Sequence, residues 1–326
     1  MNAAGCFTAA CFFYASCIVN SLFATAYANF KLIALTTIPN EIFSQHQVDV
    51  KLLRLDTIHP LVNGNKHFKL KYNLQNAIEQ KFDGILTFGG QYSNHIFAAA
   101  AAAKQHGIKS VGVVVGNENE LTSTLQFAQS CGTSLHFVNR QTYRQKDKPE
   151  FIAQLQHQYP NHYIIPEGGS NELAVKGCAE IPSLVEEDFD YIITACGTGG
   201  TLAGLAKGIQ LHQKAIGISV LKGEGTLSDA IRSLHGNHQL ENWEVITGYH
   251  FGGYAKPNDE VNNFIQEFYQ STNIQLEHIY TAKMMLAIID LVQKEYFPKG
   301  SRIIALHTGG LQLTSSDLII HKGDSA

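Results

Sequence analysis

Paired cysteines and metal-binding patterns are absent from this 326-residue sequence. Its six cysteines include no C-x-x-C pair, and its 15 histidines show no metal-ligand spacing such as H-E-x-x-H. In the body of the chain Cys131, Cys178 and Cys196 are isolated from one another, which indicates free thiols and favours a reducing, cytoplasmic compartment. We therefore expect neither a disulfide framework nor a metal site.

Charged residues are also scarce. They make up 16% of the chain, and 24 basic against 28 acidic residues leave a net charge of −4. No block of basic residues occurs, so a nucleic-acid partner is not expected. Hydrophobic residues account for 44%, as is typical of globular proteins, and the length corresponds to about two domains.

The first 30 residues carry no charged side chain at all. Residues 26–28, Ala-Tyr-Ala, resemble the cleavage site of a secretory signal, but the segment lacks the basic start of such a signal. It is long enough for a membrane span, although Asn20 and Ser21 interrupt the apolar run. An atypical signal or anchor and a mis-called start codon both remain open, so this leader is left out of the fold. For the folded body we expect no membrane partner.

Beyond residue 30, apolar runs alternate with helical patterns, which predicts an α/β fold of parallel sheets covered by helices. The expected strands are residues 48–55, 84–88, 110–115, 134–138, 163–165, 191–195, 215–221 and 302–306. The expected helices are residues 69–80, 94–105, 121–130, 202–209, 261–270 and 281–293.

Glycine-rich corners follow four of these strands, after Phe88, Ile165, Cys196 and Leu306. Ligands bind beyond the carboxyl ends of the strands in such sheets. We expect the four corners to face one cleft, which favours a small-molecule enzyme over a binding module.

The most distinctive corner is Gly197-Thr198-Gly199-Gly200-Thr201, between an apolar strand and a helix. Backbone N–H groups and hydroxyls at such a turn converge beside the positive end of the helix dipole, which favours a phosphate. A Rossmann G-x-G-x-x-G motif needs glycine where Leu202 stands, and a P-loop needs a lysine that this turn lacks. An ordinary strand-to-helix turn that uses glycine for its backbone freedom is the remaining alternative.

Three lysines, Lys66, Lys69 and Lys71, follow Asn63-Gly64-Asn65 at the entry to a predicted helix. A lysine shielded from water can lose its proton there and attack a carbonyl as a neutral amine. We expect Lys69 and Lys71 along the helix surface. From the spacing alone, a solvated basic helix start is the simpler interpretation.

Ser93, Asn94 and His95 stand at the start of another predicted helix, after Gly89-Gly90. Their side chains and the helix amides suit a carboxylate or phenolate oxygen, and N-capping by Ser93 or Asn94 is compatible with the same pattern. Two tyrosines, Tyr254 and Tyr280, lie near glycine or helix boundaries, where a buried aromatic with a bonded hydroxyl is the simpler interpretation.

In their order along the chain, these segments resemble the 1-aminocyclopropane-1-carboxylate deaminase/D-cysteine desulfhydrase family of pyridoxal-phosphate (PLP) enzymes. The resemblance covers residues 36–312. The matching segments are 63–66 (Asn-Gly-Asn-Lys), 69–74 (Lys-Leu-Lys-Tyr-Asn-Leu), 93–95 (Ser-Asn-His), 197–201, 280–283 (Tyr-Thr-Ala-Lys) and 307–310 (His-Thr-Gly-Gly).

The resemblance implies the fold of tryptophan-synthase-β-like, fold type II PLP enzymes. In that fold two open, twisted, mostly parallel sheets are flanked by helices, and the cofactor lies in the cleft between domains. The implied large domain comprises residues 31–68 and 178–326, with a small domain, residues 69–177, inserted into it. A homodimer is implied as well.

The resemblance also implies roles for individual residues. Lys66 would form the Schiff base with PLP, Asn94 would bond the phenolic oxygen of the ring, and Thr308 would lie against the pyridine nitrogen. The phosphate would be held by Thr198, Gly199, Gly200 and Thr201. The implied catalytic or substrate-binding residues are Ser93, Asn94, His95, Tyr254, Tyr280 and Thr281.

Two positions indicate the branch of the family. Members that open the cyclopropane ring carry glutamate directly after the second tyrosine, whereas this sequence has Thr281 there and Thr308 in the late glycine corner. A threonine hydroxyl does not hold a proton firmly on the pyridine nitrogen, so the ring is a weaker electron sink, suited to elimination of a good leaving group. We therefore predict α,β-elimination of D-cysteine to pyruvate, ammonia and hydrogen sulfide.

Alternatives stay open at this point. Within the family they are 1-aminocyclopropane-1-carboxylate deaminase activity, which gives 2-oxobutyrate and ammonia, and action on other D-amino acids such as D-serine or β-chloro-D-alanine. Two alternatives come from other classes. An NAD-type dehydrogenase would need the third glycine of its motif, which this sequence lacks. A non-catalytic PLP carrier would not need the lysine and the two tyrosines.

Overall fold

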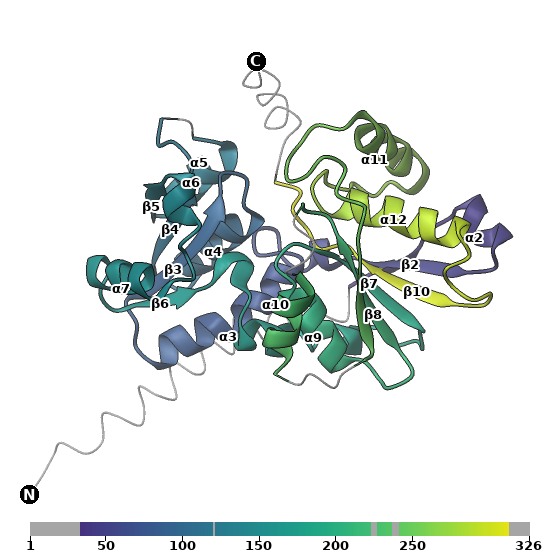
Figure 1. Ribbon diagram of the computed structural model, residues 1–326, viewed down its shortest axis with the longest axis horizontal. Coiled ribbons are helices and arrows are strands. Elements are labelled where there is room, and N and C mark those ends of the chain that lie inside the picture. Colours follow the sequence, from purple (N-terminus) through teal and green to yellow (C-terminus); the bar gives the residue numbers. More distant parts are fainter. Residues whose placement is uncertain (1–32, 120, 223–226, 237–240, 313–326) are drawn as a thin grey trace, which may run out of the picture.

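Two separate β-sheets form the framework of the protein, which we describe in a computed structural model over residues 33–119, 121–222, 227–236 and 241–312. The uncharged leader at residues 1–30 lies outside the described residues. Figure 1 shows the two sheets side by side, each with helices packed on it. The expected α/β architecture of two mostly parallel sheets flanked by helices is confirmed.

The larger sheet has six strands in the order β1-β2-β10-β7-β8-β9. Only β1 runs antiparallel, against β2, and the other pairs are parallel. Its central strands are continuous apolar runs, because helices cover both faces of the sheet and bury the side chains on each. The strands are β1 (Leu35–Thr37), β2 (Asp49–Leu53), β7 (Tyr191–Cys196), β8 (Lys214–Ser219), β9 (Trp243–Ile246) and β10 (Arg302–Leu306).

Two hydrophobic cores hold helices on the faces of this sheet. One core joins the strands to α2 (Glu41–Gln45), α11 (Asp259–Thr272) and α12 (Thr281–Gln293). The other joins them to α9 (Gly200–Gly208) and α10 (Leu227–His235). Figure 1 shows these two groups of helices on opposite sides of the strands.

The smaller sheet has four parallel strands in the order β5-β4-β3-β6. Its strands are β3 (Gly84–Gly90), β4 (Lys109–Val115), β5 (Thr133–Val138) and β6 (His162–Ile165), all of them within the range expected for the inserted domain. Its helices are α4 (Asn94–Gln105), α5 (Ser123–Ser130), α6 (Arg140–Tyr143) and α7 (Pro149–Gln158). The domain boundaries themselves stay a prediction.

Helix α3 (Asn65–Glu79) passes between the two halves and packs on α4, α8 (Glu172–Cys178) and α9. It begins four residues before the expected start, because Gly64 turns the chain with a φ of +62° and leaves Lys66 on the first helical turn. Short 3-10 turns occur at Leu55–Thr57, Glu167–Gly169 and Pro182–Leu184. In the described part of the chain, no helix is long and apolar enough to cross a membrane.

Candidate active site

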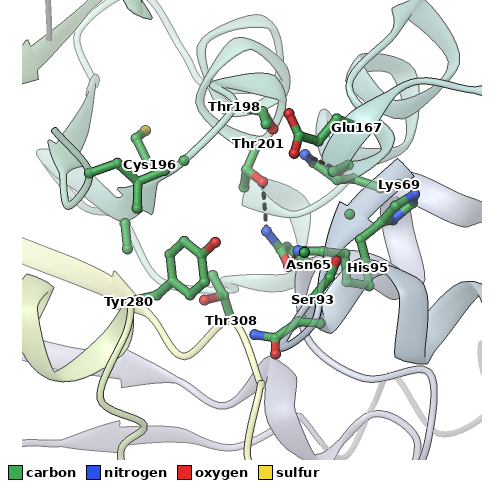
Figure 2. Close-up of a pocket in the computed structure, with 18 of the residues that line it drawn as sticks. Asn65, Lys69, Ser93, His95, Glu167, Cys196, Thr198, Thr201, Tyr280 and Thr308 are labelled. Atoms are coloured by element: carbon green, nitrogen blue, oxygen red, sulfur yellow. Dashed lines mark hydrogen bonds between the residues drawn. The ribbon is translucent and has the colours of Figure 1, made fainter. Parts of the chain in front are cut away.

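A cavity of about 280 Å³ opens between the two sheets, at the carboxyl ends of their strands. All four glycine-rich corners contribute to its lining, through Gly90, Gly168, Gly197 and Thr308 among others. Figure 2 shows Tyr280 and Thr308 on one side, with Asn65, Ser93 and His95 facing them. The expectation that these corners share one cleft is therefore confirmed.

The turn at residues 197–201 lies at the N-terminus of α9, where helix N–H groups point into the cavity. Gly199 has a left-handed φ of +79°, and a Cβ there would come within 2.5 Å of Ile231. A Cβ on Gly200 would lie 2.6 Å from Ser170 Oγ. Glycine at these two positions thus lets backbone amides, rather than side chains, line this end of the cavity.

Neighbouring segments hold this turn in place. Asn65 Nδ2 donates to Thr201 Oγ1 at 2.8 Å, which ties the start of α3 to the start of α9 (Figure 2). The hydroxyls of Thr198 and Ser170 are 2.5 Å apart, which ties the turn to the corner after β6. The turn is therefore fixed by both halves of the protein.

Lys66 lines the cavity from the first turn of α3, and its Nζ lies 2.9 Å from Asn65 Oδ1. Burial, with a smaller contribution from the positive charge of Lys69, lowers the Lys66 pKa to about 7. A substantial fraction of this amine is consequently neutral at physiological pH and able to attack a carbonyl.

Lys69 and Lys71 differ from the expectation that they lie on the helix surface. Lys69 is 2% exposed and donates to Gly168 O at 2.8 Å and to Ser170 Oγ at 3.0 Å. Lys71 is also buried and pairs with Glu180 at 2.7 Å. The interpretation as a solvated basic helix start is wrong, because α3 is covered by α8 on the side that carries these lysines.

A second cation therefore stands beside the anion-binding turn. A Cβ placed on Gly200 would be 3.1 Å from Lys69 Nζ, so the ammonium lies close to the N-terminus of α9. Burial lowers the Lys69 pKa, yet its hydrogen bonds to two oxygens favour the charged donor. Lys69 would supply counter-charge to a phosphate at this turn.

Helix α4 points its N-terminus into the cavity from the opposite side. Ser93 caps the helix by accepting from Ile96 N at 3.2 Å, and Asn94 Oδ1 accepts from Gln312 Nε2 at 2.5 Å. His95 is buried, and its Nε2 donates to Thr87 Oγ1 at 2.8 Å, because Thr87 donates its own proton to Ile165 O. Burial holds the His95 pKa well below its ordinary range, so the ring is neutral and its Nδ1 is left without a partner.

Tyr254, Tyr280 and Thr308 also line the cavity, and Tyr280 and Thr308 face Ser93 and His95 across it (Figure 2). Desolvation of the hydroxyls at the cavity, reinforced by neighbouring ionisable groups, raises the pKa of both tyrosines. Their hydroxyls therefore remain protonated and able to donate. Thr308 presents an uncharged side chain at the end of β10, as its sequence position suggested.

Thr281 is not among the residues that line the cavity. It is fully buried, and its Oγ1 accepts from Glu277 N at 2.9 Å and donates to Glu277 O at 3.3 Å. The Glu277 carboxylate in turn accepts from Ile279, Tyr280 and Thr281 N–H groups. Any effect of Thr281 on a ligand would therefore act at the start of α12, next to a buried carboxylate.

Sequence reasoning did not assign Asn65, Lys69 or Glu167 to the cavity that they line, nor Ser170, which contacts Lys69 and Thr198 beside it. Glu167 lines the cavity from the corner after β6, where Tyr143 donates to it at 2.7 Å and Lys146 lies 3.4 Å away. The Gly168-Gly169 pair beside it was a signal for this corner, but nothing in the sequence indicates which side chains face inward.

Comparison with known proteins decides the family. The family model described as "Pyridoxal-phosphate dependent enzyme" matches residues 33–309. The chain belongs to this family. The fold agrees, since a solved structure described as an ACC deaminase homologue superimposes with a TM-score of 0.76 at 30% identity, over 88% of this chain and 93% of that one.

Named relatives of the family are similar over most of their length. A mitochondrial protein of Arabidopsis thaliana, named bifunctional D-cysteine desulfhydrase/1-aminocyclopropane-1-carboxylate deaminase, is 29% identical over 77% of this chain and 69% of its own. A Klebsiella pneumoniae protein named D-cysteine desulfhydrase is 27% identical over 80% of this chain and 87% of its own. The protein is thus a PLP-dependent enzyme with the fold type II architecture.

The residues of the cavity fit this cofactor. A lysine with a depressed pKa suits an aldehyde, and a glycine-rich turn at a helix N-terminus with a buried second cation suits a phosphate monoester. Lys66 would hold the aldehyde carbon, the turn at residues 198–201 with Lys69 would hold the phosphate, and Asn94 and Thr308 would lie at the ring.

The low pKa of Lys66 has a measurable consequence in cofactor-free protein. Acylation of Lys66 by an amine-reactive reagent should rise about tenfold per pH unit and level off above about pH 7, because only the neutral amine reacts. The rate at an ordinary lysine keeps rising to about pH 10. Peptide mass spectrometry over a pH series measures both rates, and a Lys66 rate that still climbs beyond about pH 9 would contradict a buried, easily deprotonated amine.

Proposed function

We propose that the protein is a D-cysteine desulfhydrase, which eliminates sulfide from D-cysteine and releases pyruvate and ammonia. The proposal is carried by one combination of residues: an uncharged Thr308 lines the same cavity as Lys66, together with two tyrosines whose raised pKa keeps them protonated. One D-cysteine and one water give one pyruvate, one ammonia and one hydrogen sulfide, so the reaction needs no external oxidant or reductant.

The substrate carboxylate would bind at the N-terminus of α4. Ser93, the backbone N–H groups there and the helix dipole provide donors and positive potential for an anion. His95, held neutral by burial, carries no charge that competes for the carboxylate. The α-carbon would then lie near Tyr254 and Tyr280, within reach of Lys66 on α3.

Lys66 would move the α-proton. Its amine, with a pKa of about 7, can accept a proton at neutral pH. PLP, when bound, supplies the electron sink that makes this carbon acidic. The remaining residues orient the substrate and keep water away from the reacting carbon.

The tyrosine hydroxyls would assist the departing sulfur. Tyr254 and Tyr280 stay protonated because their pKa values are raised, so each is a donor to the negative charge that develops on the leaving group. Elimination removes the β-substituent without requiring a protonated pyridine ring, which agrees with a hydroxyl at Thr308 rather than an acid.

The direct test is a product assay on purified, PLP-loaded protein with D-cysteine, L-cysteine and 1-aminocyclopropane-1-carboxylate. The proposal predicts equal amounts of sulfide and pyruvate from D-cysteine. Release of 2-oxobutyrate from the cyclopropane amino acid, without sulfide from D-cysteine, would contradict it and favour the deaminase instead. If D-serine or β-chloro-D-alanine gave more pyruvate than D-cysteine, that amino acid would be the preferred substrate.

Replacing Thr281 and Thr308 tests whether these two positions determine which reaction the enzyme catalyses. The double substitution Thr281→Glu with Thr308→Leu should reduce sulfide release from D-cysteine and favour cyclopropane opening. The Glu277 carboxylate beside position 281 makes this change costly, since two buried carboxylates repel each other. The free energy of unfolding must therefore be measured alongside. Unchanged sulfide release by a folded double variant would show that neither position controls specificity.

We also propose a homodimer and the inserted-domain boundaries at residues 69 and 177, on the strength of the family resemblance. Size-exclusion chromatography with light scattering tests the first, and limited proteolysis tests the second.

A further inference from the structure

Lys283 is a buried lysine that the reaction outlined above does not use. It lies on the first turn of α12, is 0% exposed, and donates through Nζ to His250 O and Gly253 O, each at 2.9 Å. A lysine amine is costly to bury without partners, so these two bonds account for its presence in the core. Burial lowers the Lys283 pKa to about 8, but the amine keeps at least two N–H groups in either state, so both bonds persist.

The acceptors of these bonds belong to the Tyr254 loop, which we define as residues 250–256. This loop has an unusual backbone, with positive φ angles at Phe251 (+45°), Gly252 (+91°), Gly253 (+118°) and Ala255 (+50°). Positive φ is unfavourable for residues other than glycine and persists only where surrounding contacts enforce it. Lys283 lies under the middle of this strained segment.

A second contact from the same region fixes the end of the loop. His278 Nε2 donates to Lys256 O at 2.8 Å, and Ala255 packs with Tyr92 and Ile279 in a small buried cluster. The Tyr254 loop is thus attached to the start of α12 on either side of Tyr254 itself. The tyrosine is 38% exposed, and its hydroxyl makes no hydrogen bond to any residue that the structure describes.

Tyr280 comes from the same short segment as Lys283. It is the residue before α12, and the Glu277 carboxylate accepts its backbone N–H at 2.8 Å. The first turn of α12 therefore places Tyr280 directly and reaches Tyr254 through Lys283. Since Lys283 is not among the residues lining the cavity, it does not touch a ligand there.

We propose that Lys283 is a positioning residue. It holds the Tyr254 loop so that the hydroxyls of Tyr254 and Tyr280 both face the substrate. The proposal rests on the proposed function in one respect, the participation of Tyr254 in the reaction. The attachment of the loop to α12 is independent of it.

The test is a double-mutant cycle on the PLP-loaded enzyme with D-cysteine. Lys283→Met keeps the length of the side chain and removes its donors, and it should lower kcat by roughly 10- to 100-fold, with a much smaller change in KM. In a Tyr254→Phe background, adding Lys283→Met should lower kcat by a further factor of less than about two, because the hydroxyl to be positioned is gone. In a Tyr280→Phe background it should retain its full effect.

Gly252→Ala provides a second variant from the loop side of the contact. Its Cβ would meet nothing closer than 3.5 Å, so the substitution acts through the φ of +91° and should show the same dependence on Tyr254. Gly132→Ala is the matched control, since Gly132 has the same φ of +91° and open space around it, far from the loop in sequence. Lys294→Met, at the exposed end of α12, controls for loss of a lysine; neither control should change kcat.

Hydrogen exchange supplies a readout that needs no substrate. Lys283→Met should accelerate exchange of the amides in residues 250–256 and leave those of α9 unchanged. Unchanged exchange in the loop would overturn the proposal, and so would faster exchange combined with equal kcat losses in all three backgrounds. If the enzyme turns over no D-amino acid, the proposed function fails, and loop exchange alone decides whether Lys283 holds the loop.

Discussion

Replacing Lys66 with alanine should abolish turnover and remove the covalently attached cofactor, while leaving the fold intact. The expected loss in kcat is about 10³-fold or more, as for removal of a residue that acts at every chemical step. The Lys66 side chain lies at the cavity wall, and among the described residues its amine donates to Asn65 alone, so alanine leaves space without disrupting the core. Absorbance of the lysine-bound cofactor and steady-state rates measure the two effects.

Lys69→Met is the matched control for this change. Lys69 lies one helical turn further along α3 and contacts Gly168 and Ser170, so its loss should weaken phosphate binding without removing the covalent attachment. Cofactor titration should show reduced affinity with the absorbance band preserved. If Lys66→Ala kept the band and Lys69→Met lost it, the covalent residue would be Lys69.

Gly64→Ala should be the most damaging glycine substitution near the site. A Cβ at Gly64 would lie 1.9 Å from Thr308 O and 2.3 Å from Thr308 C, at a φ of +62°. Backbone atoms cannot move aside as a side-chain end can, so the start of α3 and the end of β10 must separate. Overpacking and the left-handed backbone together predict a loss of about 3 kcal/mol or more in the free energy of unfolding.

Gly107→Ala isolates the backbone part of this loss. Gly107 has a nearly identical φ of +65° and nothing within 4 Å of a Cβ, so it should lose only about 1 kcal/mol. Urea unfolding of both variants provides the comparison, and cofactor titration should show weaker binding for Gly64→Ala alone. Equal shifts in the two unfolding midpoints would contradict a close approach between Gly64 and Thr308.

Elements with strong patterns could be predicted from the sequence. The bounds of α4, α12 and β10 agree with expectation because each pairs a long apolar pattern with a clear start or end. Strand β9 was missed because its four residues, Trp243–Ile246, are only half-buried and form no alternating pattern. Its place in the sheet is set by pairing with β8 rather than by its own composition.

The candidate site could be predicted where glycines mark strand ends, and less well where it depends on distant packing. The corners at Gly90 and Gly197 could be predicted as ligand-binding positions, because ligands bind beyond the carboxyl ends of the strands in parallel sheets. The burial of Lys69 could not be predicted from the sequence, because it depends on contacts with a segment 99 residues later in the chain. The same holds for Lys283, whose acceptors are 30 and 33 residues away.

The most direct test of the whole account is to identify the lysine that carries the cofactor. The PLP-loaded protein is reduced with borohydride, digested, and its peptides are analysed by tandem mass spectrometry. The account predicts a pyridoxyl group on Lys66, in the first turn of α3, and on no other residue. A pyridoxyl group on Lys69, Lys71 or Lys283, or on none of the lysines, would contradict it.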